Sequence, residues 1–156
     1  SFQEPRGFGL RDDMLYRAVK FRHKLGQPAG GRHKAYYIFL GDLNTMGLNY
    51  PFESDISFDK EIKKWDKRAP RYYGMRRLKK TVDKTWRGIV DNEIKDSNLD
   101  NVYATKNLQF KKIYKNGVEA KVDVIGWVDE TTDIAKDTWN ELYSDHSLLN
   151  FTVLKV

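Results

Sequence analysis

Ala35-Tyr36-Tyr37-Ile38-Phe39-Leu40-Gly41-Asp42-Leu43-Asn44 is the stretch around which the rest of the fold is predicted to be organised. Its first six residues are apolar or aromatic, and such a run is typical of a strand buried on both faces. In an open α/β sheet, ligands bind just beyond the carboxyl ends of such strands. If the chain stays extended after Gly41, alternation places the side chains of Asp42 and Asn44 on one side. The alternative is an Asp/Asn turn that only closes the strand.

Two further stretches carry polar residues at the start of predicted strands. Ser144-Asp145-His146-Ser147 leads into residues 148–156, where alternating apolar residues indicate a closing strand. Earlier in the chain, Asp100 precedes Val102 and Ala104, which favours a strand that begins at a carboxylate. Each polar residue also has an ordinary interpretation: Asp145 could cap a turn, His146 could be a half-buried residue with its hydrogen bonds satisfied, and Asp100 could close a turn.

The three stretches together, in this order, resemble the endonuclease/exonuclease/phosphatase superfamily. That superfamily includes deoxyribonuclease I-like nucleases, abasic-site endonucleases, sphingomyelinases and inositol-phosphate phosphatases. The resemblance implies an α/β (α+β) fold with one mixed, mainly antiparallel sheet and flanking helices, like the C-terminal half of the family's two-sheet sandwich. The first half of that sandwich, which supplies a metal-binding glutamate, is not found. Gln3-Glu4 has the local pattern of that glutamate, but no apolar strand precedes it and it lies too close to Asp42.

The resemblance also implies a role for each polar residue. Asp42 would orient or deprotonate the attacking water, and Asn44 would hold a phosphate oxygen or a metal-bound group. His146 would contact the scissile phosphate, and Asp100 would fix its tautomer and favour its protonated form. Asp145 would be the metal-side carboxylate, so Asp145, Asp42 and Asn44 are the predicted ligands. Such hard oxygen ligands suit Mg²⁺ or Mn²⁺.

Composition narrows the classes of function. A chain of 156 residues without repeats or linkers is predicted to form a single domain, 1–156. No cysteine is present, which excludes disulfides, thiolate metal sites and cysteine nucleophiles. No apolar run approaches the length of a membrane helix, and no secretory signal pattern opens the chain, so we expect no membrane partner and a cytoplasmic location. The net charge of +6 favours contact with a polyanion.

The most basic segment is 60–87, which holds twelve Lys or Arg and three acidic residues, with Trp65, Tyr72, Tyr73 and Trp86 interleaved. The functional interpretation is a surface that follows a phosphate backbone and offers aromatic rings for stacking. The alternative is a solvated helical pair whose aromatic residues belong to the core. The predicted nucleic-acid-binding residues are Lys63, Lys64, Lys67, Arg68, Arg71, Arg76, Arg77, Lys79 and Lys80.

Periodicity predicts the remaining elements. Residues 1–11 are predicted to be irregular. Helices are predicted from Asp12 or Asp13 to about Leu25, from a cap at Ser57, over a second pattern that contains Met75, Leu78 and Val82, and over 131–143 with Ile134, Trp139 and Leu142 inward. Residues 86–97 are predicted to be a polar connection. Asn116-Gly117 between extended runs predicts a hairpin.

We therefore expect a metal-dependent phosphodiester hydrolase, a nuclease acting on DNA or RNA, that is incomplete as this chain and is completed by a preceding segment or a second chain. Two alternatives stay open. One is a catalytically silent module that binds nucleic acid through the basic segment. The other is a phosphatase for inositol or lipid phosphates, whose core residues resemble those of the nucleases.

Overall fold

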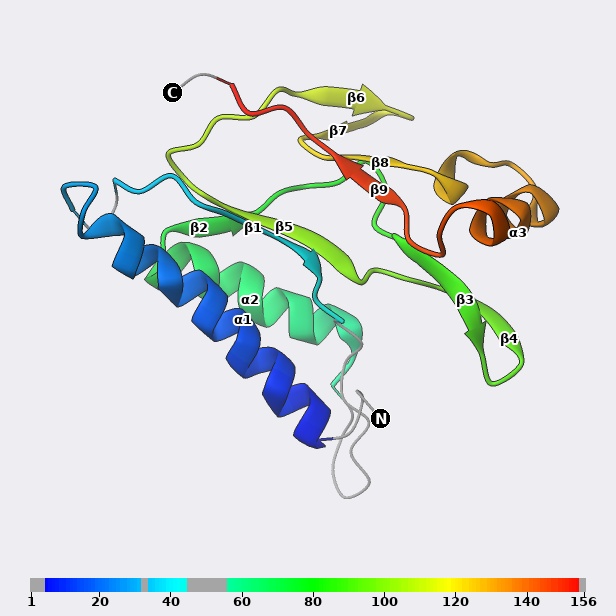
Figure 1. Cartoon of the computed structure of the whole chain (residues 1–156), viewed down its shortest axis with the longest axis horizontal. Coiled ribbons are helices and arrows are strands. Elements are labelled where there is room, and N and C mark those ends of the chain that lie inside the picture. Colours follow the sequence, from blue (N-terminus) through cyan, green and yellow to red (C-terminus); the bar gives the residue numbers. More distant parts are fainter. Residues whose placement is uncertain (1–4, 32–33, 45–55, 155–156) are drawn as a thin grey trace.

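The computed structural model describes residues 5–31, 34–44 and 56–154, and this part of the chain is an α+β structure (Figure 1). The α+β class predicted from the sequence is confirmed. Within the described residues, no helix is both long enough and apolar enough to cross a bilayer. The elements, in chain order, are α1 (Pro5–Gly26), β1 (Ile38–Asp42), α2 (Phe58–Tyr72), β2 (Met75–Arg77), β3 (Trp86–Val90), β4 (Glu93–Ser97), β5 (Asp100–Thr105), β6 (Ile113–Lys115), β7 (Val118–Ala120), β8 (Asp123–Ile125), the 3₁₀ turn η1 (Trp127–Asp129), α3 (Asp133–Leu142) and β9 (Leu148–Asn150).

The central sheet has three antiparallel strands in the order β1-β5-β2. All six residues of β5 are buried, because β5 has a strand on each side and a layer of side chains on each face. β1, by contrast, lies at the edge of this sheet, and its residues are half-buried or exposed. The prediction that the 35–40 run is buried on both faces is therefore wrong. The run does form a strand, but the doubly covered position belongs to β5.

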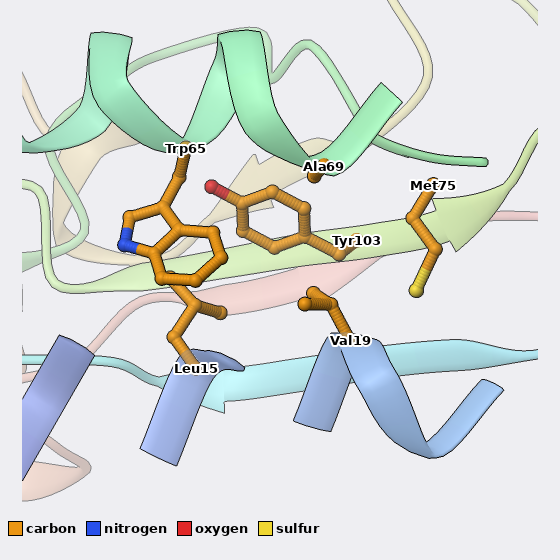
Figure 2. Close-up of a cluster of buried hydrophobic side chains, with 6 residues drawn as sticks. All are labelled: Leu15, Val19, Trp65, Ala69, Met75 and Tyr103. Atoms are coloured by element: carbon orange, nitrogen blue, oxygen red, sulfur yellow. The ribbon is translucent and has the colours of Figure 1, made fainter. Parts of the chain in front are cut away.

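Helices α1 and α2 lie side by side on one face of this sheet (Figure 1). The core between them contains two residues of α1, Leu15 and Val19, and two of α2, Trp65 and Ala69. Met75 of β2 and Tyr103 of β5 complete it, and the Tyr103 ring lies between the two helices (Figure 2). Burial of such large apolar side chains is the main stabilising contribution to the contact between helices and sheet.

The opposite face of β5 packs against the C-terminal half of the chain. Val102 and Ala104, which alternate with Tyr103, contact a second buried cluster, and Leu149 and Phe151 at the end of the chain pack on it. β8 and β9 form an antiparallel pair above this face. The alternation of β5 therefore divides the molecule into a helical layer and a layer that contains β9, and Asp100 belongs with Val102 on the β9 side.

The other strands form two-stranded pairs, β3-β4, β6-β7 and β8-β9, where one continuous sheet was expected. Isolated bridges connect these pairs to neighbouring segments: Lys80 with Val122, Trp86 with His146, and Phe110 with Val153. The bridge between Lys80 and Val122 is parallel, whereas the strand pairs and the other two bridges are antiparallel.

Three predicted elements are confirmed. Ser57 caps α2, and its Oγ accepts a hydrogen bond from the Lys60 amide. The hairpin β6-β7 turns at Asn116-Gly117, where both residues have positive φ (51° and 76°), as a type I′ turn requires. Helix α3 is present, but of its three predicted inward residues only Trp139 is partly covered, whereas Ile134 and Leu142 are 81% and 68% exposed. The inward orientation of those two residues was wrong.

Three further predictions are corrected. The helix predicted from residue 12 or 13 already begins at Pro5, a residue that fits the first turn of a helix. Residues 75–77 form strand β2 rather than a second helix, because Gly74 at φ 60° turns the chain out of α2 and Met75 pairs with Thr105. Residues 86–97 form the hairpin β3-β4 rather than a polar connection.

Candidate functional site

A carboxylate–imidazole pair lies where the start of β5 meets the residues before β9. Nδ1 of His146 is 2.8 Å from Oδ2 of Asp100. The Asp100 side chain is 12% exposed and that of His146 is 31% exposed, so the carboxylate is nearly covered and the ring reaches solvent. Because the carboxylate occupies Nδ1, Nε2 is the ring nitrogen left for an outside group. The fold thus brings together Asp100 and His146, the two residues that were predicted to interact.

Strand register explains why Asp42 belongs to the same face. β1 and β5 are antiparallel, and Asp42 is the partner of Asp100, just as Leu40 is the partner of Val102. Side chains of opposed residues in an antiparallel pair project to the same face. Asp42 is exposed, so it supplies a solvent-facing carboxylate on the same face of the sheet as the covered carboxylate of Asp100.

The end of β1 is also an Asx turn. The backbone amide of Asn44 donates to Oδ1 of Asp42 over 2.8 Å, and Asn44 has φ 49°. This is the turn that the sequence offered as the alternative to a ligand-binding role, and it breaks the extended backbone on which the same-side placement of Asn44 depended. The turn engages one carboxylate oxygen of Asp42, Oδ1, and does not involve the other.

Strand β3 fixes the segment that carries His146. Trp86 and His146 form an antiparallel bridge, and the Arg87 amide donates to the Asp145 carbonyl over 3.0 Å. The Ser147 amide donates to the carbonyl of Thr85 over 2.7 Å. The hydroxyl oxygen of Thr85 in turn accepts from the Asp100 amide over 3.0 Å. The backbone of Asp100 and the residues on either side of His146 are therefore all hydrogen-bonded to the stretch 85–87.

Asp145 is exposed, and its Oδ2 accepts a hydrogen bond from Nε1 of Trp86 over 2.8 Å. This bond fixes the carboxylate against the β3-β4 hairpin. Across the residues that the structure describes, no group of three or more His, Cys, Asp or Glu side chains is arranged to hold a metal ion. Asp42 and Asp145 therefore belong to no such group among the described residues. Gln3-Glu4, the candidate for a further ligand, lies outside the described residues.

Lys80 is 3% exposed and lies against the backbone of Asp100. Its Nζ donates to the carbonyl of Asp100 and to Oδ1 of Asn98, each over 2.6 Å. Burial lowers the pKa of Lys80 to about 7; the carboxylates of Asp83 and Asp100 act against this shift and Arg77 adds to it. The prediction that Lys80 contacts a nucleic-acid backbone is corrected, because its ammonium group is enclosed.

The other basic residues of the 60–87 segment divide into two groups. Several make internal contacts: Lys64 binds Asp12 over 2.7 Å, and Arg77 forms a two-bond pair with Asp66. Arg68 lies near Asp12 and over the Trp65 ring, and Arg76 donates to the Leu108 carbonyl. The predicted residues that are exposed and have no ion pair with a described residue are Lys63, Lys67, Arg71 and Lys79.

The aromatic residues of the segment also divide. Trp65 is 1% exposed and belongs to the core, as the alternative interpretation expected. Tyr72 is 52% exposed, and the Arg71 guanidinium lies 5.2 Å from its ring centre. An exposed ring beside a cation is a surface on which a base can stack. Of the predicted nucleic-acid-binding residues, those that are exposed and form no ion pair with a described residue lie on one face of α2 and in the turn after β2.

Sequence reasoning did not identify Lys80 as a buried support or Thr85 as a hydrogen-bonding partner of the site. Both residues act through the backbone of Asp100 or of Ser147, and such contacts leave no local pattern. Comparison of the chain with protein-family models, with curated proteins and with solved structures gives no match. The site therefore has to be interpreted from its own geometry.

Proposed function

We propose that the protein is a phosphodiester hydrolase acting on nucleic acid. The observation that carries this proposal is the Asp100–His146 contact of 2.8 Å, with Asp42 opposite Asp100 in the strand register. A covered carboxylate, an imidazole with one free nitrogen and an exposed carboxylate are the groups that general acid–base hydrolysis requires. The positive net charge of +6 supports a polyanionic substrate over a neutral one.

In this proposal each residue has one task. Asp100 accepts a hydrogen bond from Nδ1–H of His146 and so directs Nε2 toward the substrate. With the imidazole protonated, Nε2 donates to a phosphoryl oxygen and stabilises the charge that develops there. Asp42 accepts a proton from the attacking water through the carboxylate oxygen that its Asx turn leaves available. The water oxygen then bonds to phosphorus, the P–O ester bond breaks, and the leaving oxygen takes a proton from solvent.

Mg²⁺ or Mn²⁺ enters the proposal as a cation that Asp145, Asp42 and Asn44 would share with the substrate phosphate. When bound, such a cation stabilises charge on phosphoryl oxygens. Because no group of three or more His, Cys, Asp or Glu side chains among the described residues is arranged to hold a metal ion, we derive no step through the metal. We further propose that a preceding segment or a second chain completes the site.

The proposal is tested by incubating the purified protein with labelled DNA and RNA, with and without Mg²⁺. We expect cleavage that falls about 10²- to 10⁴-fold in His146→Asn and in Asp42→Asn. Asp123→Asn is the control, because this carboxylate binds Lys115 and Thr81 and belongs to β8. Equal rates in wild type, His146→Asn and Asp42→Asn would remove the proposal.

The first alternative is a silent nucleic-acid-binding module. The exposed cations Lys63, Lys67 and Arg71 on α2 favour it, because they need no catalytic pair to attract a phosphate backbone. It predicts binding that weakens steeply with salt and no product at any metal concentration. Turnover that depends on His146 separates the hydrolase from this module.

The second alternative is a lipid-phosphate phosphatase. A hollow of about 340 Å³ adjoins Asp42, and Leu10, Met14 and Leu40 are among the apolar residues that line it. An apolar hollow beside an acidic residue suits an acyl chain better than it suits a sugar–phosphate backbone. Release of phosphate from a phosphorylated lipid, impaired by Met14→Lys, would favour this alternative over the nuclease.

A further inference from the structure

Thr85 is a buried residue between β2 and β3 whose hydrogen bonds reach both segments that carry the pair. It is 0% exposed. Its Oγ1 accepts from the amides of Leu99 and Asp100, over 3.2 and 3.0 Å. Its carbonyl oxygen accepts from the Ser147 amide over 2.7 Å. One residue thus binds the start of β5 on one side and the residue after His146 on the other.

This arrangement bears on catalysis because Asp100 and His146 lie 46 positions apart in the chain. The distance between their side chains depends on how the two backbones are held. A displacement of about 1 Å in a catalytic group can lower a rate about 10²-fold. Thr85 is hydrogen-bonded to both backbones, at Asp100 and at Ser147, so a single residue links them.

We propose that Thr85 is the positioning residue of the site, which sets the distance between Asp100 and His146 through hydrogen bonds to the backbone of each segment. Thr85 touches no substrate in this assignment and acts only through the pair. Its effect on catalysis rests on the proposed hydrolase function, whereas its effect on the geometry of His146 does not.

Thr81 provides a matched control within the same stretch of chain. It is also buried, at 6% exposure, and its Oγ1 donates to Asp123 and accepts from the Val124 amide. Thr81 therefore joins this stretch to β8 as Thr85 joins it to β5, but its side-chain hydrogen bonds go to Asp123 and Val124 and to neither Asp100 nor His146. Thr→Val at either position removes one hydroxyl and keeps the shape of the side chain.

The experiment records the imidazole ¹⁵N chemical shifts of His146, which report which ring nitrogen carries the proton, in wild type, Thr85→Val, Thr85→Ser and Thr81→Val. We expect the shifts to move toward those of a histidine without a fixed tautomer in Thr85→Val only. Thr85→Ser keeps the hydroxyl and should retain the wild-type shifts. Unchanged shifts in folded Thr85→Val would overturn the proposal.

The same variants separate positioning from the proposed function. If the protein cleaves nucleic acid, Thr85→Val should lower kcat about 10- to 100-fold with little change in KM, and Thr81→Val should leave kcat within about threefold. If no variant shows turnover but the His146 shifts change only in Thr85→Val, the positioning role holds and the hydrolase proposal fails.

If Thr85→Val does not fold, amide hydrogen exchange in the wild-type protein tests the positioning role of Thr85. The amides of Asp100 and Ser147 should exchange with solvent far more slowly than that of exposed Asp145, because each donates to a buried Thr85 oxygen. Fast exchange at either amide would show that its hydrogen bond to Thr85 does not hold that segment, and would overturn the proposal.

Discussion

Oδ2 of Asp100 lies 2.8 Å from Nδ1 of His146, and the carboxylate is the more covered of the two groups. A carboxylate in this position accepts a hydrogen bond from Nδ1–H and leaves Nε2 to face outward. The contact joins the most buried strand of the sheet to the segment before β9. Both the tautomer of His146 and the proposed chemistry follow from it.

Asp100→Asn should reverse the tautomer of His146. The asparagine keeps the size of the side chain but can present an amide N–H to Nδ1, which moves the imidazole proton to Nε2. The ¹⁵N shifts of the two ring nitrogens should then exchange places, and any hydrolysis should fall about 10²- to 10⁴-fold. Asp123→Asn should change neither. Retention of the wild-type tautomer in Asp100→Asn would show that the carboxylate does not orient the ring.

Lys80→Met should change how stability depends on pH. Burial lowers the pKa of folded Lys80 to about 7, whereas the unfolded chain keeps it near 10.5. Below pH 7 the lysine is charged in both states, and the cost of burying the charge is fully present. Between pH 7 and 10.5 the folded state loses the proton first, so the wild type gains about 1.4 kcal/mol per pH unit relative to the variant.

Urea denaturation of wild type and Lys80→Met from pH 6 to pH 10 measures this difference. Lys79→Met is the control, because Lys79 is exposed and adjacent in the chain. The difference between wild type and Lys80→Met should be constant below pH 7 and should shift in favour of the wild type above it. Parallel curves over the whole range would show that Lys80 keeps an ordinary pKa.

Arg87→Met should destabilise the protein and release α3. The Arg87 guanidinium is 5% exposed and binds Asp96, Asp133 and Asp137 over 2.9–3.0 Å, so one side chain joins β3, β4 and α3. Loss of these charged hydrogen bonds should cost about 1.5–3 kcal/mol. Arg17→Met, which breaks only an exposed pair with Asp13, should cost less than about 0.5 kcal/mol. Equal losses in the two variants would contradict this account.

Nucleic-acid binding should depend on the exposed cations of α2. The triple variant Lys63→Ala, Lys67→Ala, Arg71→Ala should bind DNA more weakly. The slope of log K against log salt should fall by about two to three, since each lost phosphate contact removes about 0.9 from it. The control triple Lys34→Ala, Lys106→Ala, Lys111→Ala removes the same charge from other exposed positions. Identical slopes for the two triples would show that only net charge matters.

Local patterns predicted the elements whose signals are short-range. Ser57 before an amphipathic run predicted the start of α2, and Asn116-Gly117 predicted the hairpin β6-β7. The hairpin β3-β4 was missed because its turn is Asp91-Asn92, which adopts the same left-handed conformation (φ 53° and 61°) without a glycine. Met75 was assigned to a helix because it begins a set of three apolar residues with helical spacing. That short pattern does not outweigh the pairing of Met75 with the central strand β5.

Some residues of the candidate site could likewise be predicted from local sequence patterns, and others could not. Asp42, Asp100 and His146 could be proposed from the sequence because Asp42 follows a predicted strand and Asp100 and His146 each stand at the start of one. Thr85 and Lys80 could not, since their partners are backbone atoms brought close only by the complete fold. The burial of Lys80 within a basic segment is likewise a tertiary property, because the segment's composition favours a solvated surface.

The most direct test of the central claim is whether the Asp100–His146 pair faces a phosphodiester. The measurement is a titration of ¹⁵N-labelled protein with a phosphorothioate dinucleotide, which resists hydrolysis, while the His146 ring signals are followed. The account predicts a saturable shift of the Nε2 signal in wild type that weakens with salt and is lost in Asp42→Ala. A His146 signal that stays unchanged at saturating dinucleotide, while signals elsewhere move, would contradict it.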